Sequence, residues 1–209
     1  MEPEDGLYLG AGLYERRVAK LLLDPPAYPT CQVVMLPSFQ PETAVFMVRD
    51  RKQSASDKII ATEIASGLYR AMTVELEKGR RNGSYLETEV SIRAALDKVR
   101  PTVLRSEADI DSATANLLVQ VCRRVLSRVG YTDPPRIGFD GQMYHLVQCE
   151  PKVGCRSGRT WSPPQGSTAY DFVQLALEMQ RFARAKSSAE RSAARVRMIT
   201  EAHALLSRR

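Results

Sequence analysis

The spacing of apolar residues divides this chain into strand-like and helix-like segments. Residues 31–37 and 43–50 are rich in β-branched and aromatic residues, and Pro41 in the connection between them interrupts pairing. They predict two adjacent strands. Residues 57–66 fit two periodicities, since Ile60 and Ile64 suit a helix while an alternating pattern suits a strand. The neighbouring strands favour a third strand there.

Residues 70–96 show an alternation typical of a long hairpin. Met72, Val74 and Leu76 alternate with polar residues, and the "RRNGS" that follows supplies turn chemistry. A second alternating run begins at Leu86. We therefore expect two paired strands in this region.

Two segments show helical spacing before residue 132. Residues 13–24 place apolar residues near one side of a helix, and the "PPAYP" after them stops it. Residues 106–131 carry the strongest apolar stripe of the chain, with Ser106 or Asp109 placed to cap the first turn and Gly130 to end the helix. This helix must pack flat on a sheet.

Residues 138–180 predict a hairpin followed by a helix. Met143, His145 and Val147 alternate with their neighbours, and Asp140-Gly141 forms a turn pair in front of them. Residues 155–163 return as a second strand, which Pro163-Pro164 ends. "QGST" then caps a helix whose apolar residues recur from Phe172 onward.

Together these segments predict an α+β fold in one domain, residues 1–185, followed by a basic helical C-terminal extension, residues 186–209. The helices near Ile110 and Phe172 should cover one face of an antiparallel sheet of five to six strands. The strands are expected to begin near Cys31, Thr43, Met72, Leu86, Met143 and Arg156.

Composition is that of a soluble globular protein, with 44% hydrophobic and 26% charged residues among 209. No window reaches the roughly 18 uncharged apolar residues of a membrane span, and "VAKLLL" is too short for a signal-peptide core. We therefore expect no membrane partner and a cytoplasmic location, or a periplasmic one if a leader has been trimmed before Met1.

The positive charge is concentrated at the C-terminus. The formal net charge is +6, and residues 176–209 hold eight Lys or Arg against three Glu, a net +5. This pattern suits a solvated helix face, an acidic protein partner or nucleic acid, but no aromatic residues alternate with the arginines as in a single-strand binder. The candidate partner-binding residues are Arg181, Arg184, Arg191, Arg195 and Arg197.

The helix of this extension also has an apolar side, which includes Met198, Ala202 and Leu205. A solitary helix with such a stripe is incomplete. It should pack back on the domain, for example against the N-terminal helix around Leu21, or dock on another protein.

The four cysteines do not define a disulfide scaffold or a zinc site, because they are irregularly spaced and include no CxxC. Cys122 lies on the apolar face of its predicted helix and is interpreted as a small buried hydrophobic residue. Cys149 and Cys155 flank a hairpin loop. They can pair in an oxidising compartment and would stay as thiols in the cytosol.

No constellation for catalysis is evident. His145 lacks a nearby carboxylate or nucleophile, since strand pairing brings Arg159 or Trp161 toward it more readily than an acid. Asp140 is best explained as bonding its own backbone, and His203 is too far along the chain from His145 for metal spacing. We therefore predict no catalytic residue, no metal and no cofactor.

The segments "PSFQPETAVFMV", "FDGQMYHLV" and "TWSPPQGSTAYDFVQLALEM" resemble small bacterial proteins, some of which are immunity proteins beside secreted toxins. The shared positions carry turn and strand-edge roles and include the structural set Asp140, Gly141, Tyr144, Trp161, Pro163 and Gly166. The resemblance implies a non-enzymatic binding module, most concretely an immunity-type inhibitor of an acidic effector. The alternative is a nucleic-acid-associated protein that uses its basic C-terminal helix, and a weaker one is an enzyme centred on His145 and Asp140.

Overall fold

A computed structural model describes residues 2–3, 12–23, 30–38, 40–49, 56–81, 88–129, 141–150 and 153–208. The strands are β1 (Glu2–Pro3), β2 (Cys31–Pro37), β3 (Thr43–Val48), β4 (Asp57–Ile64), β5 (Val103–Ile110), β6 (Gln142–Glu150) and β7 (Gly154–Trp161). The helices are α1 (Leu13–Leu22), α2 (Leu68–Arg81), α3 (Glu89–Lys98), α4 (Ser112–Leu126), α5 (Thr168–Arg184) and α6 (Ser188–Ser207).

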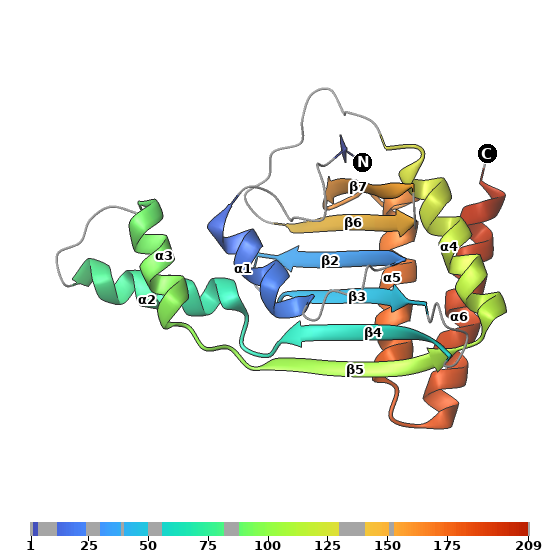
Figure 1. Cartoon of the computed structure of the whole chain (residues 1–209), viewed down its shortest axis with the longest axis horizontal. Coiled ribbons are helices and arrows are strands. Elements are labelled where there is room, and N and C mark those ends of the chain that lie inside the picture. The colour runs from blue at the N-terminus through green and yellow to red at the C-terminus, as the bar shows by residue number, and fades with distance from the viewer. Residues whose placement is uncertain are drawn as a thin grey trace.

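The strands form one antiparallel sheet in the order β1-β7-β6-β2-β3-β4-β5 (Figure 1). Hairpins connect β2 to β3, β3 to β4 and β6 to β7, whereas the α2–α3 pair is inserted between the neighbouring strands β4 and β5. The predicted α+β class is therefore confirmed. The strand at residues 57–64 and the β6–β7 hairpin are confirmed with it.

The sheet carries a hydrophobic core on each face, because the central strands are buried on both sides. Val33 and Met35 of β2 belong to a core shared with α4, α5 and α6, while Val34 and Leu36 belong to a core shared with α1, α2 and α3. Figure 1 shows α1 on one face, α5 on the other, and the α2–α3 pair extending past the strand ends. The helices predicted near Ile110 and Phe172 to cover the sheet correspond to α4 and α5, which lie on one of these two faces.

The predicted hairpin over residues 70–96 is wrong. Its described parts form the helices α2 and α3, and Leu86 lies outside the described residues. Leu68 and Met72 are buried at helical spacing, whereas Val74, which the alternating pattern assigned to a buried strand face, is 44% exposed. The alternating positions therefore include both a residue of the buried helix stripe, Met72, and a residue of the exposed helix surface, Val74.

The predicted helix start is also wrong. Residues 103–110 form strand β5, which pairs with all of β4, and α4 begins only at Ser112. Neither Ser106 nor Asp109 is the cap, because Asp111 accepts a hydrogen bond from the Thr114 N–H at 3.0 Å. Gly130 lies outside the described residues.

Helix α6 packs back on the domain, one of the two outcomes expected for its apolar stripe. Ala194, Met198, Ala202 and Leu205 are buried in the core with α4 and α5. The suggested contact with the N-terminal helix is wrong, since α1 belongs to the core on the opposite face. The boundary predicted after residue 185 follows the end of α5 directly, yet α6 completes the same core.

Candidate docking groove

The turn motif around Gly141 ties three strand ends together. The Ser38 hydroxyl donates to the Gly141 carbonyl at 2.9 Å, and the Gln142 N–H donates to the Ser162 hydroxyl at 3.0 Å. A Cβ on Gly141 would lie 2.6 Å from the Trp161 ring, so only glycine fits here. Asp140, predicted beside it, lies outside the described residues.

The other residues of the predicted structural set also lie in local packing positions. Tyr144 is buried in β6, and its hydroxyl donates to Gln142 Oε1 at 2.8 Å. Pro163 follows the end of β7, and Gly166 adopts a φ of +82° in the turn before α5. Ser167 then caps α5 by accepting from the Tyr170 N–H at 3.1 Å, as "QGST" predicts.

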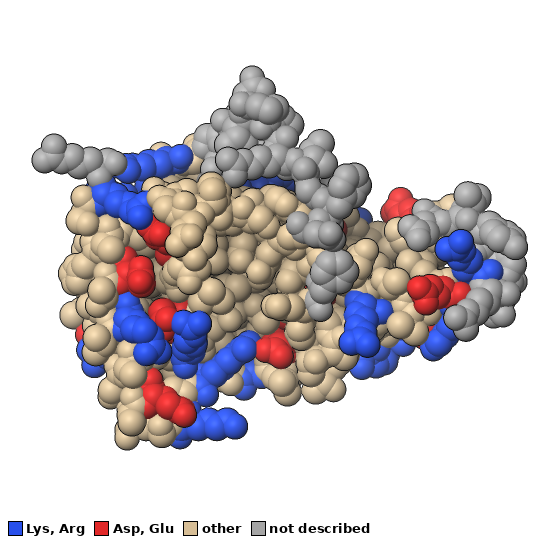
Figure 2. Space-filling model, turned by 180° about the vertical axis from the view of Figure 1, so that it is seen from behind, with Lys and Arg blue, Asp and Glu red and all other residues tan. Residues whose placement is uncertain are grey.

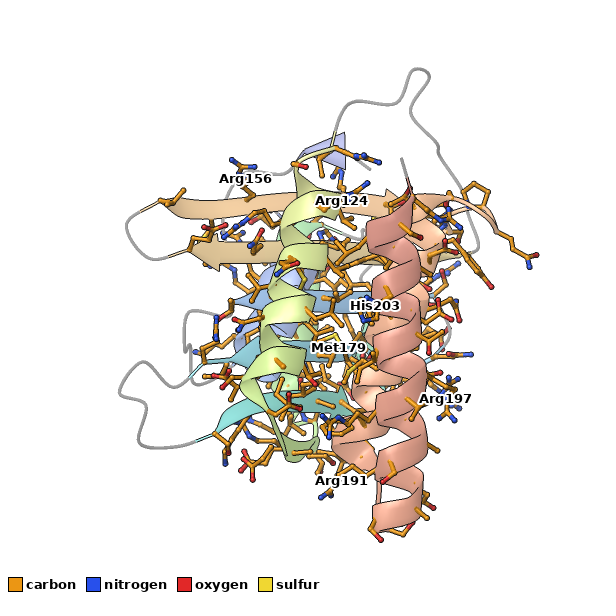
Figure 3. The ribbon with its side chains drawn as sticks, turned by 90° about the vertical axis from the view of Figure 1, so that its right-hand side faces the viewer. Arg124, Arg156, Met179, Arg191, Arg197 and His203 are labelled. Carbon is orange, nitrogen blue, oxygen red and sulfur yellow. A yellow bond between two sulfur atoms is a disulfide. The ribbon has the colours of Figure 1, made fainter. Side chains whose placement is uncertain are left out.

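His145 is 3% exposed in the middle of β6. Its register partner on β7 is Arg159, the neighbour that the sequence favoured over an acid. His203 lies on the exposed side of α6 (Figure 3). Within the described residues, no group of three or more His, Cys, Asp or Glu side chains is arranged to hold a metal ion.

Most of the predicted partner-binding arginines form ion pairs within the chain. The buried Glu178 of α5 accepts from Arg181, and from Arg197 Nε at 2.9 Å. Arg184 pairs with Glu63 of β4 at 2.9 Å, and Arg195 of α6 pairs with Asp111. These contacts hold α6 to α5, α5 to the sheet and α6 to the start of α4.

Arg191, labelled at one end of α6 in Figure 3, differs from the other four. Its guanidinium donates to the Ala185 carbonyl at 3.2 Å, and it forms no ion pair with the described residues. Figure 2 shows acidic and basic side chains interspersed over the side of the molecule formed by the long helices. The positive charge predicted for the C-terminal region is therefore largely neutralised locally.

All four cysteines are paired. Cys31 of β2 is bonded to Cys122 of α4, and Cys149 is bonded to Cys155 across the β6–β7 hairpin. The pairing expected for Cys149 and Cys155 in an oxidising compartment is thus present. The interpretation of Cys122 as a simple hydrophobic residue is wrong, because it covalently joins the sheet to the helical layer.

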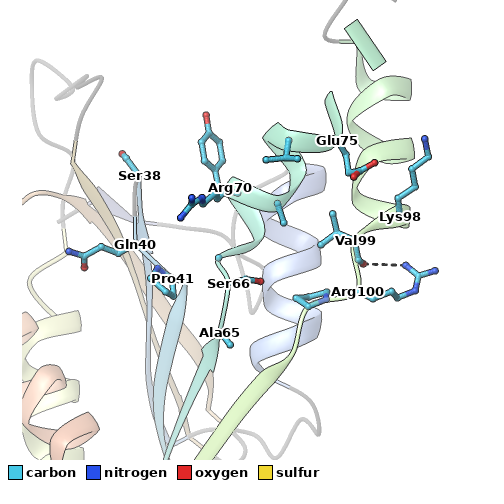
Figure 4. Close-up of a pocket in the computed structure, with 15 residues that line it drawn as sticks. Ser38, Gln40, Pro41, Ala65, Ser66, Arg70, Glu75, Lys98, Val99 and Arg100 are labelled. Carbon is cyan, nitrogen blue, oxygen red and sulfur yellow. Dashed lines mark hydrogen bonds between the residues drawn. The ribbon is translucent and has the colours of Figure 1, made fainter. Parts of the chain in front are cut away.

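A surface groove of about 570 Å³ lies at the strand ends from which the α2–α3 pair extends (Figure 4). It is lined by the β2–β3 connection at Ser38, Gln40 and Pro41, by the β4–α2 turn, by α2, and by residues 98–101, which are the last residue of α3 and the segment after it. Its volume falls within the roughly 300–1,000 Å³ typical of ligand pockets. The groove therefore joins segments that are far apart in sequence.

Glu42 fixes one wall of this groove. Its fully buried carboxylate accepts from the Leu68 N–H at 2.6 Å and the Tyr69 N–H at 2.7 Å, which are donors of the first turn of α2. The Tyr14 hydroxyl donates to the same carboxylate at 2.5 Å. Burial and the adjacent Glu42 raise the pKa of Tyr14, so its proton remains in place. Helix α2 is thus anchored to α1 and β3.

The groove is positively charged. Among the described residues that line it are Arg70, Lys98 and Arg100 and one carboxylate, Glu75. Glu75 accepts from Lys78 Nζ at 2.6 Å, and this hydrogen bond lowers the pKa of Glu75. Arg70 forms no ion pair or side-chain hydrogen bond with the described residues.

Within the described residues, the Arg100 Nη1 hydrogen bonds go to the backbone carbonyls of Asp97 and Val99, the latter at 3.2 Å. Two large apolar side chains of α2 are exposed in the same groove, Tyr69 at 47% and Val74 at 44%. Exposed apolar side chains rimmed by polar residues in a concave surface are one mark of an interaction site.

The sequence does not predict this groove, because the alternation of Met72, Val74 and Leu76 indicates a strand where α2 forms. The signal was the helical spacing of the buried Leu68 and Met72, which leaves Tyr69 and Arg70 off the buried stripe. In the part of the chain that the structure describes, no helix is long and apolar enough to cross a bilayer. Comparisons with models of protein families, with curated proteins and with solved structures gave no match.

Proposed function

We propose that this protein is a non-enzymatic protein-binding module, most concretely an immunity-type inhibitor that docks on an acidic effector. The observation that carries the proposal is the groove beside α2, where exposed Tyr69 and Val74 lie beside Arg70 and Arg100, which form no ion pair with the described residues. Aromatic and arginine side chains at a concave, positively charged surface are the usual anchors of protein complexes. The resemblance in the turn and strand motifs is consistent with this class.

The ion pairs of α6 favour this proposal over the nucleic-acid alternative. A phosphate-binding arm needs cations that neutralise phosphates and release counterions. Arg195 and Arg197 instead contact Asp111 and Glu178 of the same chain. Among the described residues that line the groove, Tyr69 is the one aromatic side chain, so they form no row of stacking platforms for successive bases.

The disulfides support an oxidising compartment such as the periplasm as the place where the protein acts. Structural disulfides persist in secreted and periplasmic proteins and are rare in the cytosol. Both pairs lie within the described fold, and one of them crosses the core. Alkylation of unreduced protein from its native source, followed by intact-mass measurement, should find no reactive thiol, whereas four alkylated cysteines would contradict this location.

Site-specific photo-crosslinking tests the function. A benzoyl-phenylalanine is placed in turn at three exposed positions on different surfaces, Tyr69 in the groove, Leu104 on β5 and Val196 on α6. In extract of the source organism, at least one position should crosslink a single protein. That protein, produced pure, should bind the chain in a fixed ratio, and coexpression of the two should relieve its toxicity.

Two results would contradict the proposal: crosslinks to nucleic acid alone, or a partner whose activity and toxicity are unchanged by binding. Truncation after Ala185 is unsuitable as a control. It would remove Met198, Ala202 and Leu205 from the core and expose the surfaces of α4 and α5 that they cover. Point substitutions of exposed residues avoid this loss.

A further inference from the structure

We infer that the groove beside α2 binds an extended acidic segment of a partner protein, with an apolar side chain flanked by carboxylates. This inference rests on the proposed protein-binding function and specifies its site and ligand. It relocates the acidic partner from α6, where the sequence pointed, to the opposite end of the sheet (Figure 1).

Charge complementarity identifies the ligand as acidic. Among the described residues that line the groove, three are cations and one is a carboxylate, Glu75, which accepts a hydrogen bond from Lys78 and lies near Lys98. The arginines of α5 and α6 differ, because four of them contact Asp or Glu side chains. Figure 2 shows basic side chains near the place where the α2–α3 pair leaves the sheet. An acidic ligand would gain most in the groove, since no local ion pair must first be broken.

The positions of the cations predict where the acidic residues lie. Figure 4 shows Arg70 on the side of the β2–β3 connection, with Lys98 and Arg100 on the side of α3. Carboxylates on both sides of a central residue would therefore meet a cation at each side. The exposed Tyr69 and Val74 of α2 supply the apolar surface for that central residue.

The groove is preformed for such a ligand. Glu42 and Tyr14 anchor the first turn of α2, and Gly67 adopts a φ of +69° in the turn that leads into it. Preorganisation lowers the entropic cost of binding a flexible peptide. The polar side chains of Gln40 and Ser66 also line the groove and can hydrogen-bond with a peptide backbone.

The test is a titration of the full-length, isotope-labelled protein with a peptide, in which the backbone amide chemical shifts are monitored by NMR. The probe is the blocked heptapeptide Gly-Asp-Glu-Phe-Asp-Glu-Gly. One control peptide replaces its acids by Asn and Gln, and another replaces Phe by Ser. The acidic Phe peptide should shift amides of residues 65–75 and 98–100, and its affinity should fall as salt rises.

The variant Arg70→Glu should weaken binding of the acidic peptide about tenfold, since it replaces an attraction by a repulsion, each worth up to roughly fivefold at an exposed site. Glutamate in the first turn of α2 is compatible with the helix dipole, so the variant should stay folded. Arg191→Glu is the matched control. It is an exposed first-turn arginine of α6 without a carboxylate partner in the described structure, and should leave binding unchanged.

Four results would overturn the inference: no binding of the acidic peptide, equal affinity for the neutral peptide, shifts that map to α6, or equal losses for Arg70→Glu and Arg191→Glu. Binding of an oligothymidylate to the groove in place of the peptide would also overturn it. The crosslinking experiment tests the proposed function independently of this site. A partner that crosslinks through Leu104 or Val196 but not Tyr69 leaves protein binding in place and removes only the groove assignment.

Discussion

The two disulfides should stabilise the fold by different amounts, because they close loops of very different length. Cys31–Cys122 joins residues 91 positions apart, and Cys149–Cys155 joins residues 6 positions apart. A cross-link removes conformations from the unfolded chain, and the entropy removed rises with the logarithm of loop length. At room temperature this relation predicts about 4.6 kcal/mol for the long loop and about 2.2 kcal/mol for the short one.

The perturbation is a pair of double variants, Cys31→Ala with Cys122→Ala, and Cys149→Ala with Cys155→Ala. The difference expected from loop length alone is about 2.4 kcal/mol. Cys31 and Cys122 are each 1% exposed, whereas in the second pair only Cys149 is buried and Cys155 is exposed, so the first pair leaves the larger buried cavity. The long-loop variant should therefore lose at least about 2.4 kcal/mol more than the short-loop variant.

The assay is urea unfolding without reductant, followed by circular dichroism, with the free energy of unfolding extrapolated to water. Loss of the long cross-link should also raise the dependence of that free energy on urea, because the unfolded chain becomes less compact. Equal losses, or a larger loss for the Cys149 and Cys155 variant, would refute the loop-length reasoning. Alkylation of four cysteines in unreduced wild-type protein would refute the pairing itself.

Three further perturbations test the packing and electrostatics. Gly141→Ala should lower the urea midpoint through a loss of about 2 kcal/mol, because its Cβ would meet the Trp161 ring at 2.6 Å. Gly79→Ala in α2, with nothing within 4 Å, should instead stabilise by about 1 kcal/mol, and equal effects would argue against this packing. Glu178→Ala should cost about 2 kcal/mol, and a double-mutant cycle with Arg197→Ala that shows no coupling would contradict the α5–α6 ion pair. Hydrogen bonds from Thr114 lower the pKa of Asp111, so its stabilisation is present above the unfolded-state pKa and lost as pH falls through the folded-state pKa. When the pH is lowered below about 4, the free energy of unfolding of Asp111→Asn should therefore fall less than that of the wild type, as measured by urea unfolding at each pH. An equal fall in both proteins would show that the carboxylate is not stabilised in the fold.

The local sequence determined the elements whose signals lie within a few residues. The hairpin β6–β7 follows from alternation along residues 142–161, and α5 follows from its Ser167 cap and apolar spacing. The strands β2 and β3 follow from β-branched and aromatic runs with a proline between them. In each case the same short segment supplies both the periodicity and the residue that begins or ends the element.

Two elements were misassigned because a local pattern was ambiguous and a distant contact decided it. Residues 68–81 alternate in part like a strand, but the Glu42 carboxylate, 26 residues before Leu68, accepts the N–H groups of the first helical turn. Residues 103–110 lack strong hydrophobicity, and their strand conformation depends on pairing with β4 from Asp57 to Ile64. Neither partner can be identified from the segment alone.

The candidate site depended on tertiary structure even more strongly. The sequence determined the number of arginines and their concentration near the C-terminus, but folding places Glu63, Glu178 and Asp111 beside them and neutralises most of that charge. The same folding joins the β2–β3 connection, α2 and the segment after α3 into a groove whose cations keep their charge available. Electrostatic complementarity depends on distances between side chains, and those distances exist only once the chain is folded.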